Sequence, residues 1–210
     1  MSSSVTYLNQ TIHNMEFLKS MENRNFERAE IFLKEGLVDI NNQEHLNMTY
    51  LHLFVRRNIE ENVKFLLEHN ADANIKDLEG ISPFHKALKI GDKGILKLFL
   101  EHGAEVNAKD YMGNTPLHIA TTWPARDLET IKLLVKNGSN LNAKNYAEQP
   151  PLFYPVSISL LIDMGADPCA LTEKHYLSLS DEIMPNIKPV IENCPFYGLV
   201  KDVVEDLAIT

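Results

Sequence analysis

The sequence predicts an all-α protein, built as a solenoid of paired helices. The first observation is a period of 33 residues, because Thr49, Ser82 and Thr115 each open a four-residue motif that ends in histidine. The second is that the asparagines Asn41, Asn74 and Asn107 recur with the same period. A period of this length is typical of stacked helical units, each of which buries its apolar face against the next.

The residues of one repeat account for its two helices. Thr115 is suited to cap the first helix, because its hydroxyl accepts a hydrogen bond from a backbone N–H in the first turn. Pro116 follows at the first helical position, where a proline sacrifices no helical hydrogen bond. The second helix is predicted over 128–136, and Gly138 ends it in a left-handed conformation.

These motifs resemble the ankyrin repeat, whose unit carries Thr-Pro-Leu-His-x-Ala near its start and Gly-Ala-Asp-x-Asn near its end. The resemblance implies an ankyrin-repeat solenoid of about four to five helix-turn-helix repeats, with β-hairpin-like loops and a helical C-terminal cap. The expected repeats are 13–43, 44–76, 77–109, 110–144 and 145–168, which together make a repeat domain over 13–168.

The first three repeats keep the pattern with local changes. In the first, Phe17 stands at the place of the motif leucine, and a second helix is predicted from Phe26 to Leu33. In the second, Phe54 replaces a small alanine, and Asn70 replaces the glycine that ends the second helix. The third departs from helix propensity at Gly94, inside its second helix.

The last two repeats are less regular. The fourth has two inserted residues near Trp123, between its helices. The fifth carries Pro150, Pro151 and Pro155 where its first helix belongs. Prolines at this density disfavour a full helix, so the sequence predicts an extended or single-turn piece followed by a helix over 156–164.

The two ends lie outside the repeat pattern. Residues 1–12 are polar and are predicted to be disordered, and 169–210 are predicted to form a helical C-terminal cap. An alternative role rests on 179–183 with Ile187, which is similar to the opening of the F-box-like segment of poxviral and intracellular-bacterial ankyrin proteins. That resemblance implies docking to a ubiquitin-ligase adaptor, although Ser180 stands where the family has proline.

Composition limits the class of protein. The chain has 210 residues, 44% of them hydrophobic, and a net charge of −9, which argues against nucleic acid or an anionic membrane as a partner. Neither a signal peptide nor a membrane span is predicted. Cys169 and Cys194 are too few for a disulfide framework, so a reducing compartment, the cytoplasm, is expected.

No pattern of residues indicates catalysis. His52, His85 and His118 recur with the repeat, so we interpret them as structural side chains. Metal-binding, phosphate-binding and nucleophile motifs do not occur around the other histidines. We therefore expect no enzyme activity, no metal and no cofactor.

A protein partner is expected at the loop tips and along the exposed side of each first helix, where the resemblance places most contacts. Aromatic, methionine and arginine side chains at such positions are typical of interfaces. The predicted partner-binding residues are His45, Leu46, Met48, Arg56, Arg57, Leu78, Glu79, Ile81, Lys89, Tyr111, Met112, Asn114, Trp123 and Tyr146. An alternative is that Tyr111 and Tyr146 pack on neighbouring loop tips.

Asn41 follows Leu33 and Asp39 in a context similar to that modified by the asparaginyl hydroxylase of ankyrin repeats, so it is a candidate for hydroxylation. Its alternative role is to close its own turn.

The function predicted from the sequence is a non-catalytic module that binds a protein through the concave face of the repeats. The alternative is a substrate-recognition adaptor of a ubiquitin ligase. Frequent asparagine, isoleucine and lysine suggest an AT-rich genome and an effector or inhibitor from a virus or intracellular bacterium, which would act in the host cytoplasm or nucleus.

Overall fold

The computed structural model describes residues 2–122, 127–153, 158–170, 192 and 194. The regular elements of these residues are helices, and no β-strand is present among them. The chain divides into two compact parts, which we call the N-terminal half, residues 1–105, and the C-terminal half, residues 106–210. The predicted all-α repeat fold is confirmed.

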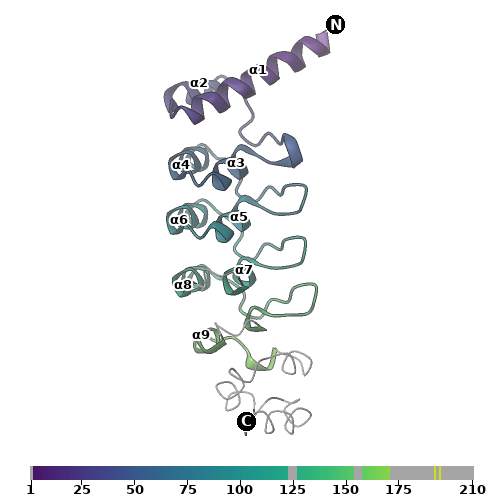
Figure 1. Ribbon diagram of the computed structural model, residues 1–210, viewed down its shortest axis with the longest axis vertical. Helices are drawn as coiled ribbons and strands as arrows, with labels where there is room; N and C mark the ends of the chain where they lie inside the picture. Colours follow the sequence, from purple (N-terminus) through teal and green to yellow (C-terminus); the bar gives the residue numbers. More distant parts are fainter. Residues whose placement is uncertain (1, 123–126, 154–157, 171–191, 193, 195–210) are drawn as a thin grey trace. The chain divides into compact units, whose positions relative to one another are not determined.

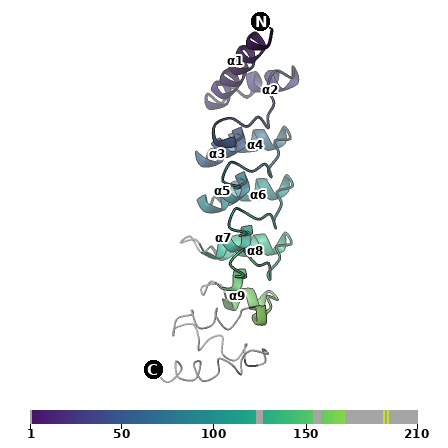
Figure 2. The same cartoon turned by 90° about the vertical axis from the view of Figure 1, so that its right-hand side faces the viewer.

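Three helix pairs make up the N-terminal half. They are α1 (Ser2–Glu22) with α2 (Phe26–Lys34), α3 (Tyr50–Arg56) with α4 (Glu60–Glu68), and α5 (Pro83–Ile90) with α6 (Lys93–Glu101), with the short 3₁₀ helix η1 (His45–Asn47) before α3. The first helices α3 and α5 lie side by side, and so do the second helices α4 and α6 (Figures 1 and 2). Each pair is thus one layer of a stack.

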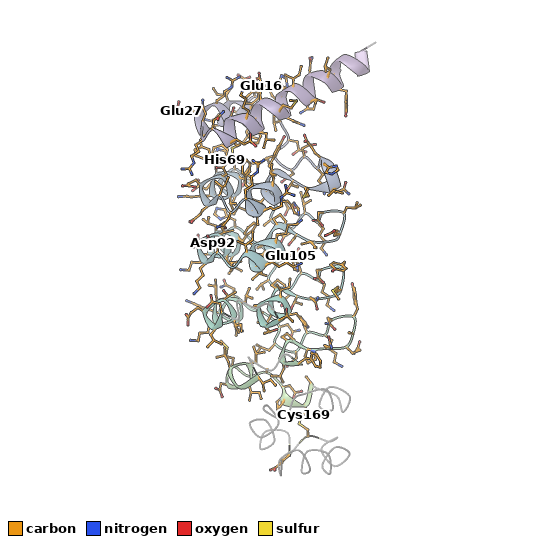
Figure 3. All side chains as sticks on the ribbon, in the orientation of Figure 1. Glu16, Glu27, His69, Asp92, Glu105 and Cys169 are labelled. Atoms are coloured by element: carbon orange, nitrogen blue, oxygen red, sulfur yellow. A yellow bond between two sulfur atoms is a disulfide. The ribbon has the colours of Figure 1, made fainter. Side chains whose placement is uncertain are left out.

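Side-chain caps start these helices. The hydroxyls of Thr49 and Ser82 accept hydrogen bonds from the backbone of α3 and α5 respectively. Asp92, labelled in Figure 3, accepts from the amides of Gly94 and Ile95 at the start of α6. These bonds satisfy donors that the first turn of a helix leaves without an internal partner.

Aromatic side chains fill the core between these layers. Phe17 is fully buried, and its ring centroid lies 4.9 Å from that of Tyr50. Phe54, which stands in place of a small alanine, is fully buried as well. Phe84 and Phe99 join α5 to α6 with a centroid distance of 5.7 Å. Neighbouring layers therefore share one apolar interior.

The prediction of a disordered segment over 1–12 is wrong, because α1 begins at Ser2. Its C-terminal turns are fixed by the buried side chains of Phe17 and Met21, and Asn62 of α4 donates to the Met21 carbonyl at 2.8 Å. Once a helix is nucleated, each further residue adds a hydrogen bond at little cost. Helix α1 therefore extends beyond the residues that contact the core.

The C-terminal half contains α7 (Pro116–Thr122) with α8 (Leu128–Lys136), then η2 (Pro151–Phe153), α9 (Ile158–Asp163) and η4 (Pro168–Ala170). Leu117, Leu134 and Leu161 are almost fully buried in it. The single turn η2 followed by α9 confirms the form expected for the proline-rich repeat. The insertion around Trp123 lies outside the described residues.

The predicted C-terminal cap, with its adaptor-docking alternative, lies almost entirely outside the described residues. At its start, Cys169 forms a disulfide with Cys194, with their Cα atoms 5.3 Å apart (Figure 3). Two cysteines led us to expect a reducing compartment, whereas disulfides are rare in the cytosol. The expected reducing compartment accordingly stays a prediction. Helices long and apolar enough to cross a membrane are absent from the described residues.

Candidate protein-binding surface

Hairpin-shaped loops precede the helix pairs. We call them fingers, and they comprise residues 44–48, 77–81, 110–114 and 145–149. In the second finger, the Asp77 carboxylate accepts from the amides of Glu79 and Ile81, both at 3.0 Å. Asp110 and Asn145 make the same two bonds in the third and fourth fingers. An Asp or Asn at the first position thus folds each of these fingers through its own side chain.

Backbone hydrogen bonds join neighbouring fingers. In the N-terminal half, the Leu78 amide donates to the Leu46 carbonyl oxygen at 2.9 Å. In the C-terminal half, the Tyr146 amide donates to the Met112 carbonyl oxygen at 3.0 Å. Two finger tips are therefore held next to each other in each half.

Large apolar side chains on these tips face solvent. Leu46 is 51% exposed and Leu78 is 68% exposed, and Tyr111, Met112 and Tyr146 are all more than half exposed. The Tyr146 ring lies against the neighbouring third finger, because a Cβ at Gly113 would be 2.8 Å from its Cδ1 and the Lys109 ammonium is 5.8 Å from its centroid. All five side chains nevertheless remain more than half exposed, so most of their apolar surface is available to a partner.

The first finger differs from the others because Glu44 stands at the position of Asp77. Its longer carboxylate reaches away from the finger and accepts from the side-chain amides of Asn14 at 3.1 Å and Asn42 at 3.2 Å. Leu46 has a φ of 60°, in the left-handed region that disfavours residues with a Cβ. Backbone strain of this kind often accompanies functional positions, and here it presents a leucine to solvent.

A cavity of about 120 Å³ lies beside this finger. It is lined by Leu18 of α1, by Asn42, Glu44, His45, Met48 and Thr49, and by Tyr50 and Leu53 of α3. Burial raises the pKa of the Tyr50 hydroxyl above its usual value, and the negative charges of Glu44 and Asp39 raise it further. The cavity consequently combines apolar walls with a negative potential.

Several predicted partner-binding residues serve the fold instead. Ile81 is only 6% exposed, so the structure removes it from the candidate surface. The guanidinium of Arg57 binds Glu22 at 2.6 Å and lies over the ring of Phe54. Asn114 accepts a hydrogen bond from the Asn145 side chain at 2.9 Å.

The remaining predicted residues stay available to different degrees. His45, Arg56, Glu79 and Lys89 are exposed, and Met48 is half-buried. Trp123 lies outside the described residues. Sequence reasoning did not identify Glu44 as part of a site. Its only signal was a glutamate in register with Asp77 and Asp110, where the shorter side chain folds the finger.

The repeated histidines are structural in this arrangement. The Thr49 amide donates to Nδ1 of His52 at 3.2 Å, so Nε2 carries the proton and donates to the Ile81 carbonyl oxygen at 3.0 Å. In the C-terminal half, His118 Nε2 donates in the same way to the Gln149 carbonyl oxygen at 2.9 Å. Each of these two histidines links its helix to the following finger. Among the described residues, no cluster of three or more potential metal ligands is present.

Asn41 links successive loops. Its side-chain oxygen accepts from the Asp72 amide at 2.8 Å, and that of Asn74 accepts from the Glu105 amide at 2.8 Å. In the C-terminal half, Asn107 accepts in the same way from the Asn140 amide. The asparagine of each repeat thereby bonds to the next loop, which explains its recurrence with the period.

Comparison with known proteins agrees with this geometry. Residues 51–145 match the family model for ankyrin repeats in three copies. No curated protein matches the chain.

Proposed function

We propose, from the premise that residues 51–145 of this chain are ankyrin repeats, that its N-terminal half binds a protein through the fingers 44–48 and 77–81 and the cavity beside the first of them. Ankyrin repeats are protein-protein interaction modules, and the family is generally non-catalytic. A fold alone does not determine which partner a protein binds, so the proposal rests on the exposed residues of these two fingers.

The observation that carries the proposal is the pair Leu46 and Leu78. Both side chains are more than half exposed, and a backbone hydrogen bond holds their fingers together. Leu46 keeps a left-handed φ that a glycine would adopt without strain. Apolar side chains held rigidly on a surface lose little conformational entropy when they bind, which makes them suitable anchors.

The cavity beside Leu46 indicates the chemistry of the partner. Its walls include Leu18, Met48 and Leu53, and the carboxylate of Glu44 lies at the same cavity. A lysine or arginine side chain fits this combination, because its aliphatic stem can lie on apolar walls while its cation meets the carboxylate. The proposed partner segment therefore carries a basic residue next to apolar ones.

The C-terminal half offers a surface of its own at Tyr111, Met112 and Tyr146. These side chains are of types that are enriched in interfaces, and all three are more than half exposed. We propose that they bind the same class of partner, a protein, independently of the N-terminal site.

Affinity purification followed by quantitative mass spectrometry tests the N-terminal site. The double variant Leu46→Ala and Leu78→Ala should reduce recovery of the partner by about tenfold or more, since two apolar anchors are each expected to contribute about 1 kcal/mol or more. The single variant Glu44→Gln should weaken the same complex, more strongly at low salt.

The matched control is Ile31→Ala with Leu128→Ala, which removes two apolar side chains that are 52% and 46% exposed on α2 and α8. This control should recover the partner at the level of the unchanged chain. Full recovery by the Leu46→Ala and Leu78→Ala variant, with circular dichroism unaltered, would exclude this site.

The finer predictions have no supporting observation among the described residues. The adaptor role rests on 179–183, which lies outside them, and nothing selects an effector origin. Hydroxylation of Asn41 remains a proposal, and peptide mass spectrometry of the protein from hydroxylase-competent cells tests it. An unmodified Asn41 peptide under those conditions would remove the proposal.

A further inference from the structure

Helix α1 has apolar side chains on two faces. Its inner face is buried against the next layer through Phe17 and Met21, which are both fully buried. Its outer face carries Leu8, Ile12 and Met15, which are 59%, 45% and 66% exposed. The terminal helix of a repeat stack normally needs a polar outer face to stay in solution. The outer face of α1 is consequently suited to a partner rather than to water.

The outer residues follow the spacing of a coiled coil. Leu8, Ile12, Met15, Lys19 and Glu22 are separated by four, three, four and three residues. This alternation keeps one stripe of side chains facing a second helix over the whole length of α1. We call these five residues the outer stripe. Ile12, Met15, Lys19 and Glu22 of the stripe line a groove of about 600 Å³ on this face.

The length of α1 fits pairing with another helix. It has 21 residues, whereas α2 has 9. Its N-terminal turns extend past α2 in both views (Figures 1 and 2). Three heptads of helix are about 30 Å long, which is enough for a short coiled coil.

For a pair formed by two copies of α1, the distribution of charge selects the antiparallel orientation. Residues 2–15 contain no Asp, Glu, Lys or Arg, whereas Glu16, Lys19 and Glu22 follow in the last turns of α1. In a parallel pair, Lys19 would face Lys19 and Glu22 would face Glu22, which is unfavourable. In an antiparallel pair, the charged end of each helix faces the uncharged end of the other, and no like charges meet.

The two acidic side chains are also neutralised within the chain. Glu16 binds Arg28 at 3.1 Å and Glu22 binds Arg57 at 2.6 Å. Glu16 is labelled on α1 in Figure 3. Because each carboxylate has a cation beside it, little net charge borders the apolar residues of the outer stripe. This lowers the desolvation cost of covering those residues with a second helix.

We propose that the outer stripe binds the outer stripe of a second copy of this chain in an antiparallel helix pair. Of the antiparallel alignments with this spacing, the one with Ile12 facing the second copy's Met15 gives the fullest overlap of the two helices. By the two-fold symmetry of such a pair, each interface contains this contact twice. The interaction is independent of the fingers, which lie on other elements.

Sedimentation equilibrium of the full chain tests the dimer, from about 1 μM to about 500 μM, the range in which a small interface is expected to assemble. With increasing protein concentration, the average molecular mass should rise from the 23.9 kDa of one chain towards twice that value. The variant Ile12→Lys should raise the dissociation constant at least about tenfold, because it buries a charge. The control Ile31→Lys, at a residue of α2 that is 52% exposed, should leave it unchanged.

A mixing experiment tests the orientation. Ile12→Lys and Met15→Glu should each be largely monomeric alone, and an equimolar mixture should form a heterodimer, since Lys at 12 of one copy then faces Glu at 15 of the other. In a parallel pair these positions would not meet, and no heterodimer would form. A monomeric unchanged chain across the whole range, a dimer that Ile12→Lys does not weaken, or a mixture without heterodimer would overturn the proposal.

Discussion

Single residues of the repeat motif act by joining one element to the next. The Thr49 amide donates a hydrogen bond to the His52 ring, and the ring donates one to the Ile81 carbonyl oxygen in the following finger. Both His52 and Thr49 are almost fully buried. The motif residues that recur in the sequence are therefore buried polar residues, whose hydrogen bonds must be formed inside the protein.

These buried histidines predict a dependence of stability on pH. Burial lowers the pKa of His52 and of His118 below the usual value. The hydrogen bond from each ring to a backbone carbonyl raises the pKa and offsets part of this decrease. The unfolded chain takes up protons near pH 6.5, before the folded protein does. Stability is accordingly full above about pH 6.5 and is lost as the pH falls towards the lowered folded values.

Chemical denaturation at about pH 7.5 and about pH 5.5 measures this loss as a decrease in the free energy of unfolding. The double variant His52→Gln and His118→Gln should be less stable at the higher pH and should lose less on acidification. An equal loss in the variant and the unchanged chain would assign the pH dependence to other groups.

A second prediction at this scale concerns Gly113, where φ is 78° and a Cβ would lie 2.7 Å from the backbone nitrogen of Tyr146. Gly113→Ala should lower the free energy of unfolding by about 2 to 4 kcal/mol, through a left-handed φ and a steric clash. Gly138→Ala isolates the cost of the left-handed φ, because Gly138 has a φ of 88° and a Cβ there would meet nothing within 4 Å. Equal losses for the two variants, by urea denaturation, would contradict the predicted clash.

At the scale of elements, α1 is the feature that local sequence patterns describe least well. Its polar first residues lack a core-facing apolar pattern, which led to the prediction of disorder. The helix forms because Phe17 and Met21 fix its C-terminal turns against the next layer. An element supported by a neighbour can extend through residues of modest propensity.

Phe17→Ala should therefore unfold more than the first helix pair alone. The side chain is fully buried and its ring is 4.9 Å from that of Tyr50 in α3. The expected loss is about 3 to 5 kcal/mol, as for other buried phenylalanines. Ile31→Ala, a change at an exposed residue of α2, is the control and should cost less than about 1 kcal/mol. Thermal and urea unfolding followed by circular dichroism measure both, and similar losses would refute this account of α1.

At the scale of the whole molecule, the chain divides into two compact halves, each built from the same repeat. In each half, asparagine side-chain oxygens accept and histidine rings donate hydrogen bonds that join successive repeats. Stability in such a stack is approximately the sum of its nearest-neighbour interfaces. A change in one repeat is thus expected to act mainly on the interfaces that this repeat forms with its neighbours.

The disulfide gives a prediction at this scale. Cys169 and Cys194 are 25 residues apart, and a cross-link that closes a loop of this size restricts the unfolded chain. Reduction should lower the stability of the C-terminal half by about 3 kcal/mol. The variant Cys169→Ser should match the reduced chain and should not respond to reductant. Two alkylated cysteines in unreduced protein, measured by intact mass, would contradict the bond.

The sequence by itself determined the period, the helix starts and the fold class, because caps, prolines and apolar spacing act within a few residues of each other. Gly138 and Asn70 take the predicted left-handed conformation for the same local reason. The tertiary structure alone decided that Ile81 is buried, that Arg57 is held by Glu22, and that α1 carries an exposed apolar stripe. Those outcomes depend on which side of an element its neighbours cover, and contacts between residues far apart in the chain set that.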